Sequence, residues 1–302
     1  MTSTLDRGAV TGLGMAPVTF EDRELVTRYT RDFDLQSCMY NFLHIFTRTR
    51  SYRFLRREEG GRLYLYNSHL DKLYYPLGAP MSAAELARTA RQLGASAIHF
   101  APERYIDATP DLADHFEVTT LPAEDEYIYD NQAIAEMAGG LYSRKRESVS
   151  KFKRTYPDHA FRVLGEADAD DCLALTETWR QQKGSNASID YEFESIQLAL
   201  SQFDALGLSG LGLYVEGRLV AYDIFSGGVG TLASCSYEKY DRDIRDCVPA
   251  LRQAIGKHLL EAGFTHMNFA RDIDDDGLRA SKSSYHPAYK LRQFILTLKA
   301  LP

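Results

Sequence analysis

The sequence is poor in the residues that build disulfide scaffolds and zinc sites. Its 302 residues include four cysteines, which are widely spaced and form no Cys-x-x-Cys pair: Cys38, Cys172, Cys235 and Cys247. The eight histidines are scattered, and none forms a His-x-x-x-His pair. We therefore expect reduced thiols and predict no metal site.

Long apolar runs are also absent. The best candidate, Cys38 to Phe46, is interrupted by Asn41 and His44, whereas a membrane-spanning helix needs about 20 apolar residues. Residues 1–17 lack the charged stretch followed by an apolar stretch that is typical of a secretory signal. We therefore expect a soluble, cytoplasmic protein. Contact with a membrane surface stays open, as does the oligomeric state.

Several catalytic motifs are missing. No Gly-x-Ser-x-Gly motif and no Gly-x-x-x-x-Gly-Lys-Ser/Thr motif occurs, which argues against a serine hydrolase and a P-loop nucleotide-binding protein. The formal net charge of -7 also lacks the positive excess typical of general nucleic-acid binding. Any contact with nucleic acid must use a local basic patch.

What the chain has is the composition of a globular protein with two domains. Hydrophobic residues make up 44% and charged residues 25%, and a chain of this length fits two domains of about 150 residues each. The best boundary is the acidic segment Pro122 to Asp130. We predict an N-terminal half over residues 1–124 and a C-terminal half over residues 125–302.

The first half contains a clear hairpin signal. Strands near Tyr52 to Leu55 and Leu63 to Tyr66 flank Gly60-Gly61, which tolerates positive φ. Ser82 is a predicted N-cap for an amphipathic helix that stops at Gly94.

The second half repeats this order of strands, helix and strand. Helices are predicted at residues 131–138, 144–156, 168–182, 191–206 and 249–262. Strands are predicted at residues 161–164, 211–215, 219–225, 231–237, 266–269 and 291–298. Hairpins that feed a crossover helix and a further strand make a mixed, partly parallel α/β sheet.

Ordered motifs in the second half resemble the phosphatidylglycerol lysyltransferase C-terminal-domain-like family. The resemblance spans about residues 125–298, with a weaker echo at residues 76–78. Its main motifs are Asp125-Glu126-Tyr127-Ile128-Tyr129, Gly140 to Arg146, Trp179, Tyr237-Glu238-Lys239 and Gly277-Leu278-Arg279 with Lys282, Ser284 and Tyr285.

This resemblance implies a tandem GNAT fold, in which two fused GNAT-like halves each form a mixed, mostly antiparallel sheet flanked by helices. It also implies the activity of Fem-like transferases, which move an amino acid from aminoacyl-tRNA to a lipid head group, a cell-wall precursor or a small metabolite. One departure leaves the acceptor open. The family's Asn-Arg-Glu-x-Asp run reads Asn268 to Asp272 here and lacks the glutamate.

Two cations behind Gly277 are the first catalytic candidates. Arg279 and Lys282 stand three residues apart, and fixed cations stabilise the oxyanion that forms when an ester is attacked by an amine. The bland alternative is pairing with the acids Asp274 to Asp276. The candidates for proton removal are Asp272, Glu238 and Tyr237. The candidates for substrate binding are Ser284, Tyr285, Asn268, Lys239 and Trp179.

A basic segment in an otherwise acidic protein is the candidate tRNA contact. Its cations are Arg144, Lys145, Arg146, Lys151, Lys153 and Arg154, of which the first five are the predicted tRNA contacts. At helical spacing, Lys145, Arg146 and Lys153 can share one face, and phosphate contacts are the functional interpretation. An ordinary solvated helix face is the alternative.

The predicted connection between a strand and a helix at residues 238–249 argues against acetyl-CoA as the acyl donor. Phosphate cradles use glycines at a helix N-terminus, but this segment has no glycine, carries four acids and includes Pro249. We therefore expect aminoacyl-tRNA as donor and no bound cofactor. Two rivals remain open: an acyl-CoA-dependent N-acyltransferase and a non-catalytic binding protein on the same scaffold.

Overall fold

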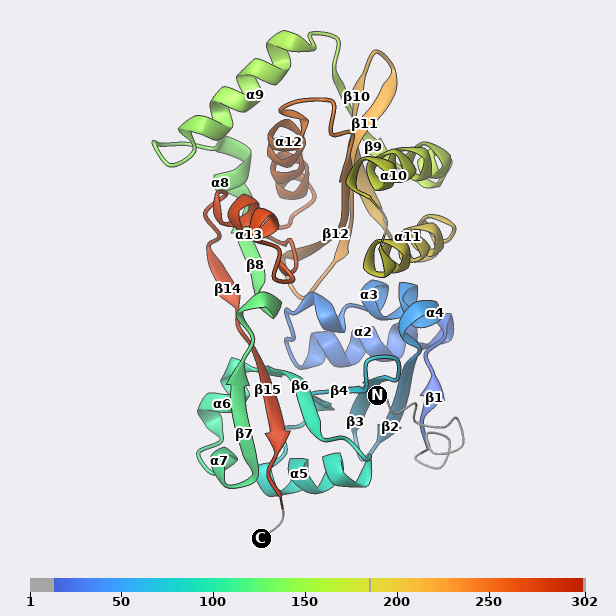
Figure 1. Cartoon of the computed structure of the whole chain (residues 1–302), viewed down its shortest axis with the longest axis vertical. Coiled ribbons are helices and arrows are strands. Elements are labelled where there is room, and N and C mark those ends of the chain that lie inside the picture. The colour runs from blue at the N-terminus through green and yellow to red at the C-terminus, as the bar shows by residue number, and fades with distance from the viewer. Residues whose placement is uncertain (1–13, 185, 301–302) are drawn as a thin grey trace. The chain divides into compact units, whose positions relative to one another are not determined.

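The computed structural model describes residues 14–184 and 186–300 (Figure 1). Contacts divide the chain into two compact units. The first contains the chain up to Glu126 together with the segment from Leu291 onward, and the second runs from Tyr127 to Lys290. No helix in the described residues is long and apolar enough to span a bilayer.

The first unit is a mixed sheet with short helices. Its strands are β1 (Ala16–Pro17), β2 (Phe54–Glu59), β3 (Arg62–Asn67), β4 (Lys72–Tyr74), β5 (Leu77–Gly78), β6 (Ala97–Pro102), β7 (Phe116–Thr120) and β15 (Gln293–Leu298). Its helices are α2 (Arg23–Asp32), α3 (Phe42–Thr47), α4 (Thr49–Tyr52), α5 (Ala83–Gln92), α6 (Glu103–Ala108) and α7 (Leu112–His115). The order along the sheet is β1-β2-β3-β4-β6-β15-β7, with β5 pairing with β3.

Local signals in this unit are confirmed. Gly60 and Gly61 adopt φ of 58° and 70° in the β2–β3 turn, where positive φ costs glycine nothing. Ser82 accepts a hydrogen bond from the backbone N–H of Glu85 at 3.2 Å, so it caps α5 as predicted.

The final strand lies in the first unit and not in the second. β15 pairs antiparallel with both β6 and β7, and its Leu296 is fully buried. The sequence-based assignment of residues 291–298 to the C-terminal half is therefore corrected. Sequence pattern identifies a strand, but long-range pairing decides which sheet receives it.

The second unit is a seven-stranded sheet with helices on both faces. Its strands are β8 (Glu126–Asp130), β9 (Ala160–Leu164), β10 (Ser209–Val215), β11 (Arg218–Gly227), β12 (Leu232–Tyr240), β13 (His266–Asn268) and β14 (Tyr289–Leu291). Its helices are α8 (Asn131–Glu136), α9 (Ser143–Thr155), α10 (Ala169–Lys183), α11 (Ala187–Leu200), α12 (Cys247–Glu261) and α13 (Asp276–Ser283).

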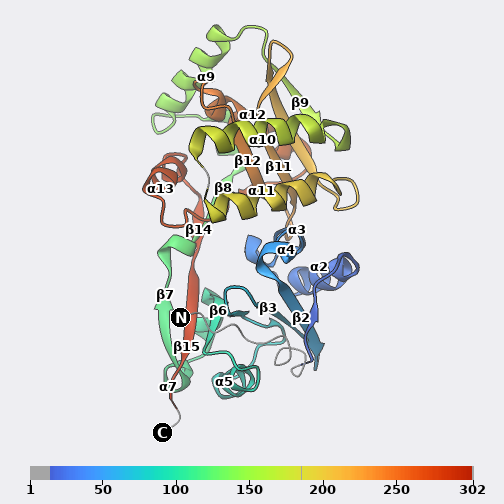
Figure 2. The same cartoon turned by 45° about the vertical axis from the view of Figure 1, so that its right-hand side comes forward.

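The strand order is β14-β8-β13-β12-β11-β10-β9. The β12–β13 pair is parallel, joined by the crossover helix α12, while β9 to β12 run antiparallel as a meander. α12 packs on one face of the sheet, and α10 with α11 covers the other (Figures 1 and 2). The mixed, mostly antiparallel sheet is as predicted.

The core of this unit lies between the sheet and α12. It combines residues of β10, β12, α12 and β13, such as Leu213, Cys235, Leu251 and Met267, all under 7% exposed. The four cysteines are buried, and none forms a disulfide within the described residues.

Candidate functional site

The Gly277-Leu278-Arg279 motif forms the start of α13, directly after the loop that follows β13. Asp275 caps this helix by accepting a hydrogen bond from the Leu278 N–H at 2.9 Å. Arg279 and Lys282 are one turn apart on α13, so both reach back toward the loop between Phe269 and Asp275. This helix and loop hold three of the predicted site residues: Asp272, Arg279 and Lys282.

Asp272 and Arg279 form a bidentate pair. Asp272 is buried, and its Oδ2 and Oδ1 accept from Nε and Nη2 of Arg279, both at 3.2 Å. The Tyr127 hydroxyl donates to the same carboxylate at 2.7 Å. Burial alone would raise the pKa of Asp272, but the hydrogen bonds from Arg279 and Tyr127 lower it. Asp272 is therefore a weak base held in its ionised form.

The guanidinium of Arg279 has further acidic partners, as the bland alternative proposed. Nη2 donates to Asp274 at 2.7 Å and Nη1 donates to Asp276 at 2.8 Å. The hydrogen bonds to Asp272 and Asp274 are the main cause of the raised pKa of Arg279. The side chain is nevertheless 40% exposed, so a permanently charged group reaches the surface in a fixed orientation.

Lys282 points inward. It is 5% exposed, and its ammonium donates to the carbonyl oxygens of Phe269 and Arg271, the latter at 2.6 Å. The Tyr129 hydroxyl donates to the carbonyl of Lys282 itself at 2.9 Å. The structure therefore brings Lys282 to the loop backbone, not to the surface beside Arg279.

A second buried ion pair joins α12 to strand β12. Arg252 donates to Glu238 through Nε at 2.7 Å and Nη2 at 2.8 Å. Its guanidinium also lies over the rings of Phe269 and Tyr285, 4.8 and 4.6 Å from their centroids. Glu238 was predicted to remove a proton, but this bidentate pairing holds it as a carboxylate in an ion pair.

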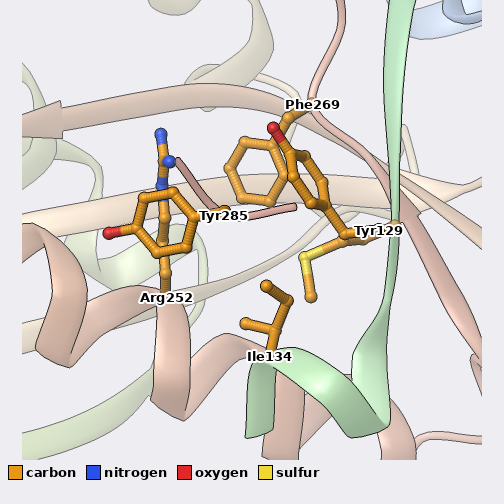
Figure 3. Close-up of a pocket in the computed structure, with 6 residues that line it drawn as sticks. Tyr129, Ile134, Arg252, Phe269 and Tyr285 are labelled. Carbon is orange, nitrogen blue, oxygen red and sulfur yellow. The ribbon is translucent and has the colours of Figure 1, made fainter. Parts of the chain in front are cut away.

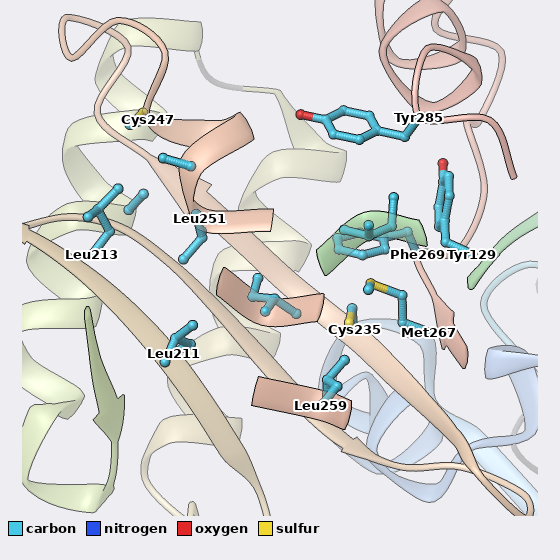
Figure 4. Packing of buried hydrophobic residues seen from close by; sticks show 14 of the residues in the cluster. Tyr129, Leu211, Leu213, Cys235, Cys247, Leu251, Leu259, Met267, Phe269 and Tyr285 are labelled. Atoms are coloured by element: carbon cyan, nitrogen blue, oxygen red, sulfur yellow. The ribbon is translucent and has the colours of Figure 1, made fainter. Parts of the chain in front are cut away.

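The same residues line a small pocket. Figure 3 shows Arg252 rising from α12 beside Tyr285, with Phe269, Tyr129 and Ile134 around them. The space between these side chains is too narrow for a water molecule. Tyr285 is buried beside the guanidinium of Arg252, and burial raises the pKa of its hydroxyl to about 12. Figure 4 places Tyr285 and Phe269 at the edge of the apolar core.

Asp223 is an isolated buried acid next to this pair. It lies opposite Glu238 on the neighbouring strand and is fully buried, and no side chain in the described part of the chain donates a hydrogen bond to its carboxylate. Burial first, and then the negative charge of Glu238, hold its pKa well above the usual range. The buried position therefore favours the protonated form of Asp223 over the ionised form.

Three predicted residues lie on the opposite face of the sheet from Glu238. Side chains alternate along β12, so Tyr237 and Lys239 face α10 and α11. Lys239 donates to Glu192 at 3.0 Å, and its ammonium lies 4.5 Å from the ring centroid of Trp179. The sheet therefore separates Tyr237, Lys239 and Trp179 from Glu238, so the predicted residues do not form one site.

The side chains of Ser284 and Asn268 form hydrogen bonds with main-chain groups. The Ser284 hydroxyl donates to the carbonyl of Ser281 at 2.6 Å, which closes the end of α13. The Asn268 side chain accepts from the N–H of Ala270 at 2.7 Å. Both stabilise the segments that carry Asp272 and Arg279.

The basic helix α9 does not present one cationic face. Lys145 lies one and two turns before the buried Val149 and Phe152, and its ammonium sits 3.9 Å from the Tyr285 ring centroid. Burial, and then the charge of Arg252, lower the pKa of Lys145 to about 8. Arg146 donates to the carbonyls of Met137 and Gly139. Lys145 and Arg146 are therefore engaged within the protein itself, and the contact of the five cations with tRNA stays a prediction.

The remaining cations of that helix do face solvent. Arg144, Lys151 and Lys153 are exposed. Lys151 is 60% exposed and lies 3.9 Å from Asp246. These three are the part of the predicted patch that a polyanion can reach.

The connection from β12 to α12 is acidic and already bonded. Asp241 is buried and accepts from Gln182 at 2.8 Å and Arg218 at 2.9 Å. Asp246, at the N-cap of α12, adopts φ of 62° and accepts no side-chain capping bond. No glycine lies in this connection, so it does not resemble a phosphate cradle.

Sequence reasoning did not select Tyr127, Arg252 or Asp223 as site residues. Tyr127 lies in a motif that was noted only for the resemblance. The other two had a usable signal, because each is a charged residue within an apolar pattern: Asp223 in the run Val220 to Phe225, and Arg252 between Leu251 and Ile255.

Comparison with solved structures identifies the fold. A conserved protein of unknown function from Bacteroides thetaiotaomicron VPI-5482 is 23% identical, with a TM-score of 0.87 over 94% of this chain and 99% of that chain. The L-PGS structure from Bacillus licheniformis is 16% identical, with a TM-score of 0.64 over 93% of each chain. A tandem GNAT protein from the clavulanic acid biosynthesis pathway is 12% identical, with a TM-score of 0.50 over 95% of this chain and 99% of that chain.

The chain has the tandem GNAT fold that these structures share. No curated protein sequence matches it. The family described as "Phosphatidylglycerol lysyltransferase, C-terminal" matches residues 30–297, which include most of the first unit, all of the second and the returning strand β15. This chain therefore belongs to the phosphatidylglycerol lysyltransferase C-terminal family.

Proposed function

We propose that this protein transfers an aminoacyl group from aminoacyl-tRNA to an amine or hydroxyl of a small molecule or a lipid head group. The family is named for a lysyltransferase, which supports a transferase with an aminoacyl donor. The observation that carries the choice of donor is the connection from β12 to α12. It is free of glycine, its Asp241 is already bonded to Gln182 and Arg218, and Pro249 removes one N–H from the first turn of α12, so it lacks the glycine-rich turn that lets backbone N–H groups approach a coenzyme A pyrophosphate.

The reaction is an attack of the acceptor nitrogen or oxygen on the ester carbonyl. A bond forms to the carbonyl carbon, the carbonyl oxygen gains negative charge, and the ester bond to the terminal ribose of the tRNA then breaks. The acceptor's proton leaves, and the ribose oxygen gains one. Because the ester is already activated, holding the two substrates together supplies much of the rate.

In this account Arg279 is the group that meets the developing charge. Its guanidinium is permanently charged, is fixed by Asp272 and is 40% exposed. An oriented donor of this kind stabilises an oxyanion more than a freely moving one. A bidentate contact of Arg279 with a phosphate of the bound tRNA would replace Asp274 and Asp276, whose side chains are 83% and 95% exposed, on the Nη1–Nη2 edge.

No strong general base is needed in this account. The pKa of Asp272 is lowered, and both carboxylate oxygens of Glu238 accept hydrogen bonds from Arg252. We therefore assign Asp272 and Glu238 to orienting the cations. The proton of an amine acceptor passes to solvent.

Donor choice is tested by binding. Calorimetry with acetyl-CoA and with a mixture of charged tRNAs is expected to give a signal for the tRNAs alone. A parallel incubation that follows deacylation of the charged tRNAs, with uncharged tRNA as competitor, separates productive binding from general polyanion binding. Micromolar binding of acetyl-CoA would contradict the proposal and favour the coenzyme A-dependent rival.

A further inference from the structure

The loop between β13 and α13 is strained. Ala270, Ile273 and Asp274 adopt positive φ of 54°, 49° and 62°. Only glycine, and to a lesser degree asparagine and aspartate, adopt this region readily, and a β-branched residue there is an outlier. Ile273 is also 57% exposed, so little packing offsets the strain at this residue.

A buried cation holds this loop in place. The Lys282 ammonium donates to the carbonyls of Phe269 and Arg271, which are on either side of the strained Ala270. Removing this cation leaves two carbonyls without their donor in a position that water does not reach, because Lys282 is 5% exposed. The second anchor is Asp272, whose backbone carbonyl accepts from Asp275 at 3.0 Å and whose carboxylate accepts from the Asp274 N–H at 3.1 Å.

The loop in turn sets the position of Arg279. The carboxylate that fixes the guanidinium belongs to Asp272, directly between the carbonyl held by Lys282 and the strained Ile273. A relaxation of Ile273 to negative φ rotates the backbone next to Asp272. The bidentate pair then loses its geometry, although no atom of Arg279 has been changed.

We propose that Lys282 is a positioning residue: its buried ammonium holds the strained loop Phe269 to Asp275 in the conformation that orients Arg279 through Asp272. Lys282 does not touch the reacting atoms, because its ammonium is directed at main-chain carbonyls. The effect on transfer rests on the function proposed above. The effect on the loop does not, since it is a property of the protein without substrate.

The test is a double-mutant cycle between Lys282→Met and Ile273→Asn. Methionine fills the space of the lysine stem but donates nothing. Asparagine tolerates positive φ far better than isoleucine, so it removes strain while the loop keeps its shape. If Lys282 holds a strained loop, Lys282→Met costs less in the Ile273→Asn background, where the strain has been removed. If Lys282 acts at the reaction centre, Lys282→Met costs the same in both backgrounds.

Without substrate, Lys282→Met is expected to speed amide hydrogen exchange across residues 270–275 at least tenfold and to lower the melting temperature. Ile273→Asn in the Lys282→Met background is expected to restore most of both. In single-turnover transfer, Lys282→Met is expected to lower the rate at saturating charged tRNA about tenfold with little change in KM, because a misplaced group costs rate more than binding. The added Ile273→Asn change is expected to recover most of that loss.

Lys239→Met is the matched control. It also removes a buried lysine of the same unit, on the other face of the sheet, and Ile273→Asn is expected to rescue none of its defects. Should Lys282→Met fail to fold, recovery of folding by Ile273→Asn makes the same comparison, and a double variant that also fails to fold contradicts the proposal. Loss of transfer with unchanged exchange in the loop and no rescue would place Lys282 at the reaction centre. If the wild type transfers no amino acid from charged tRNA, the proposed function is wrong. The double-mutant cycle measured by hydrogen exchange and melting temperature still tests whether Lys282 holds the loop.

Discussion

Asp223 shows how a single buried side chain links stability to pH. Its carboxyl is fully buried, receives no hydrogen bond from a side chain of the described residues and lies across from Glu238. An ionised carboxylate in such a place is costly, and burial and the charge of Glu238 raise the pKa of Asp223 well above its usual range. In the unfolded chain the same group ionises near pH 4.

The sign of the resulting pH dependence follows. Between the unfolded and the raised folded pKa, the folded state binds a proton that the unfolded state has released, so the free energy of unfolding falls as pH rises through this window. Asp223→Asn removes the titration and keeps the shape. We expect the variant to gain at least about 1 kcal/mol relative to wild type on going from pH 4 to pH 8.

This expectation is measured by urea unfolding at both pH values. Asp168→Asn is a control, because Asp168 lies at the start of a helix outside the core and shows no comparable burial. Parallel pH profiles for wild type and Asp223→Asn would mean that Asp223 is ionised in the folded protein and has a cation or water that satisfies it.

At the scale of elements, α9 is the clearest case of tertiary structure dividing a sequence cluster. Its cations are contiguous in the sequence, but the helix turns Lys145 toward Tyr285 and leaves Arg144, Lys151 and Lys153 exposed. The burial of Val149 and Phe152 decides which side faces inward. A sequence pattern shows that a helix is basic, whereas packing determines which of its cations a ligand can reach.

Neutralising the exposed cations should weaken tRNA binding in a salt-dependent way. We expect the triple change Arg144→Gln, Lys151→Gln and Lys153→Gln to reduce the slope of log K against log salt by about two to three, since each released counterion contributes about 0.7–0.9. Lys145→Gln is the matched control on the same helix. It should leave the slope nearly unchanged and should alter stability, because its side chain is half-buried.

Fluorescence or filter binding over a salt series with one charged tRNA checks this prediction. A slope that stays at the wild-type value in the triple variant, with melting temperature unchanged, would assign these cations to solubility. A slope that falls only in Lys145→Gln would show that the buried side of α9 opens on binding.

Local signals predicted more of the fold than of the site. The β2–β3 turn, the Ser82 cap and the meander β10–β12 follow from glycines, a capping serine and alternating apolar residues, which act within a few positions. The pairing of Asp272 with Arg279 was not predicted, because only the acids Asp274 to Asp276 were considered as partners of Arg279. The inward direction of Lys282 and the pairing of Glu238 with Arg252 depend on contacts between distant segments, which one sequence does not reveal.

At the scale of the whole molecule, the chain returns to its first unit at its end. β15 lies between β6 and β7 as an inner strand of that sheet, so the first unit is incomplete until the last strand has been made. A domain boundary drawn from composition misses this return of the chain, because the acidic linker contains no signal that a later strand joins the sheet of the first unit.

Leu296→Ala tests this arrangement. Leu296 is fully buried among first-unit residues, and truncating a buried leucine costs about 2–5 kcal/mol. We expect this loss in the free energy of unfolding of the first unit, with faster hydrogen exchange in β6 and β7 and unchanged exchange in β10–β12. Thr297→Ala, on the exposed side of the same strand, should change little. Equal destabilisation of β10–β12 would contradict the assignment of β15 to the first unit.

The most direct test of the proposed activity is single-turnover transfer from charged tRNA. Wild type is mixed in excess with tRNA carrying a labelled amino acid, and the label is followed into a panel of amines, hydroxyl compounds and phosphatidylglycerol vesicles. We predict that the label leaves the tRNA and enters at least one acceptor, and that Arg279→Ala lowers this rate about 10²-fold or more while Thr297→Ala leaves it intact. No transfer from any charged tRNA, or consumption of acetyl-CoA with the same acceptors, would contradict the account.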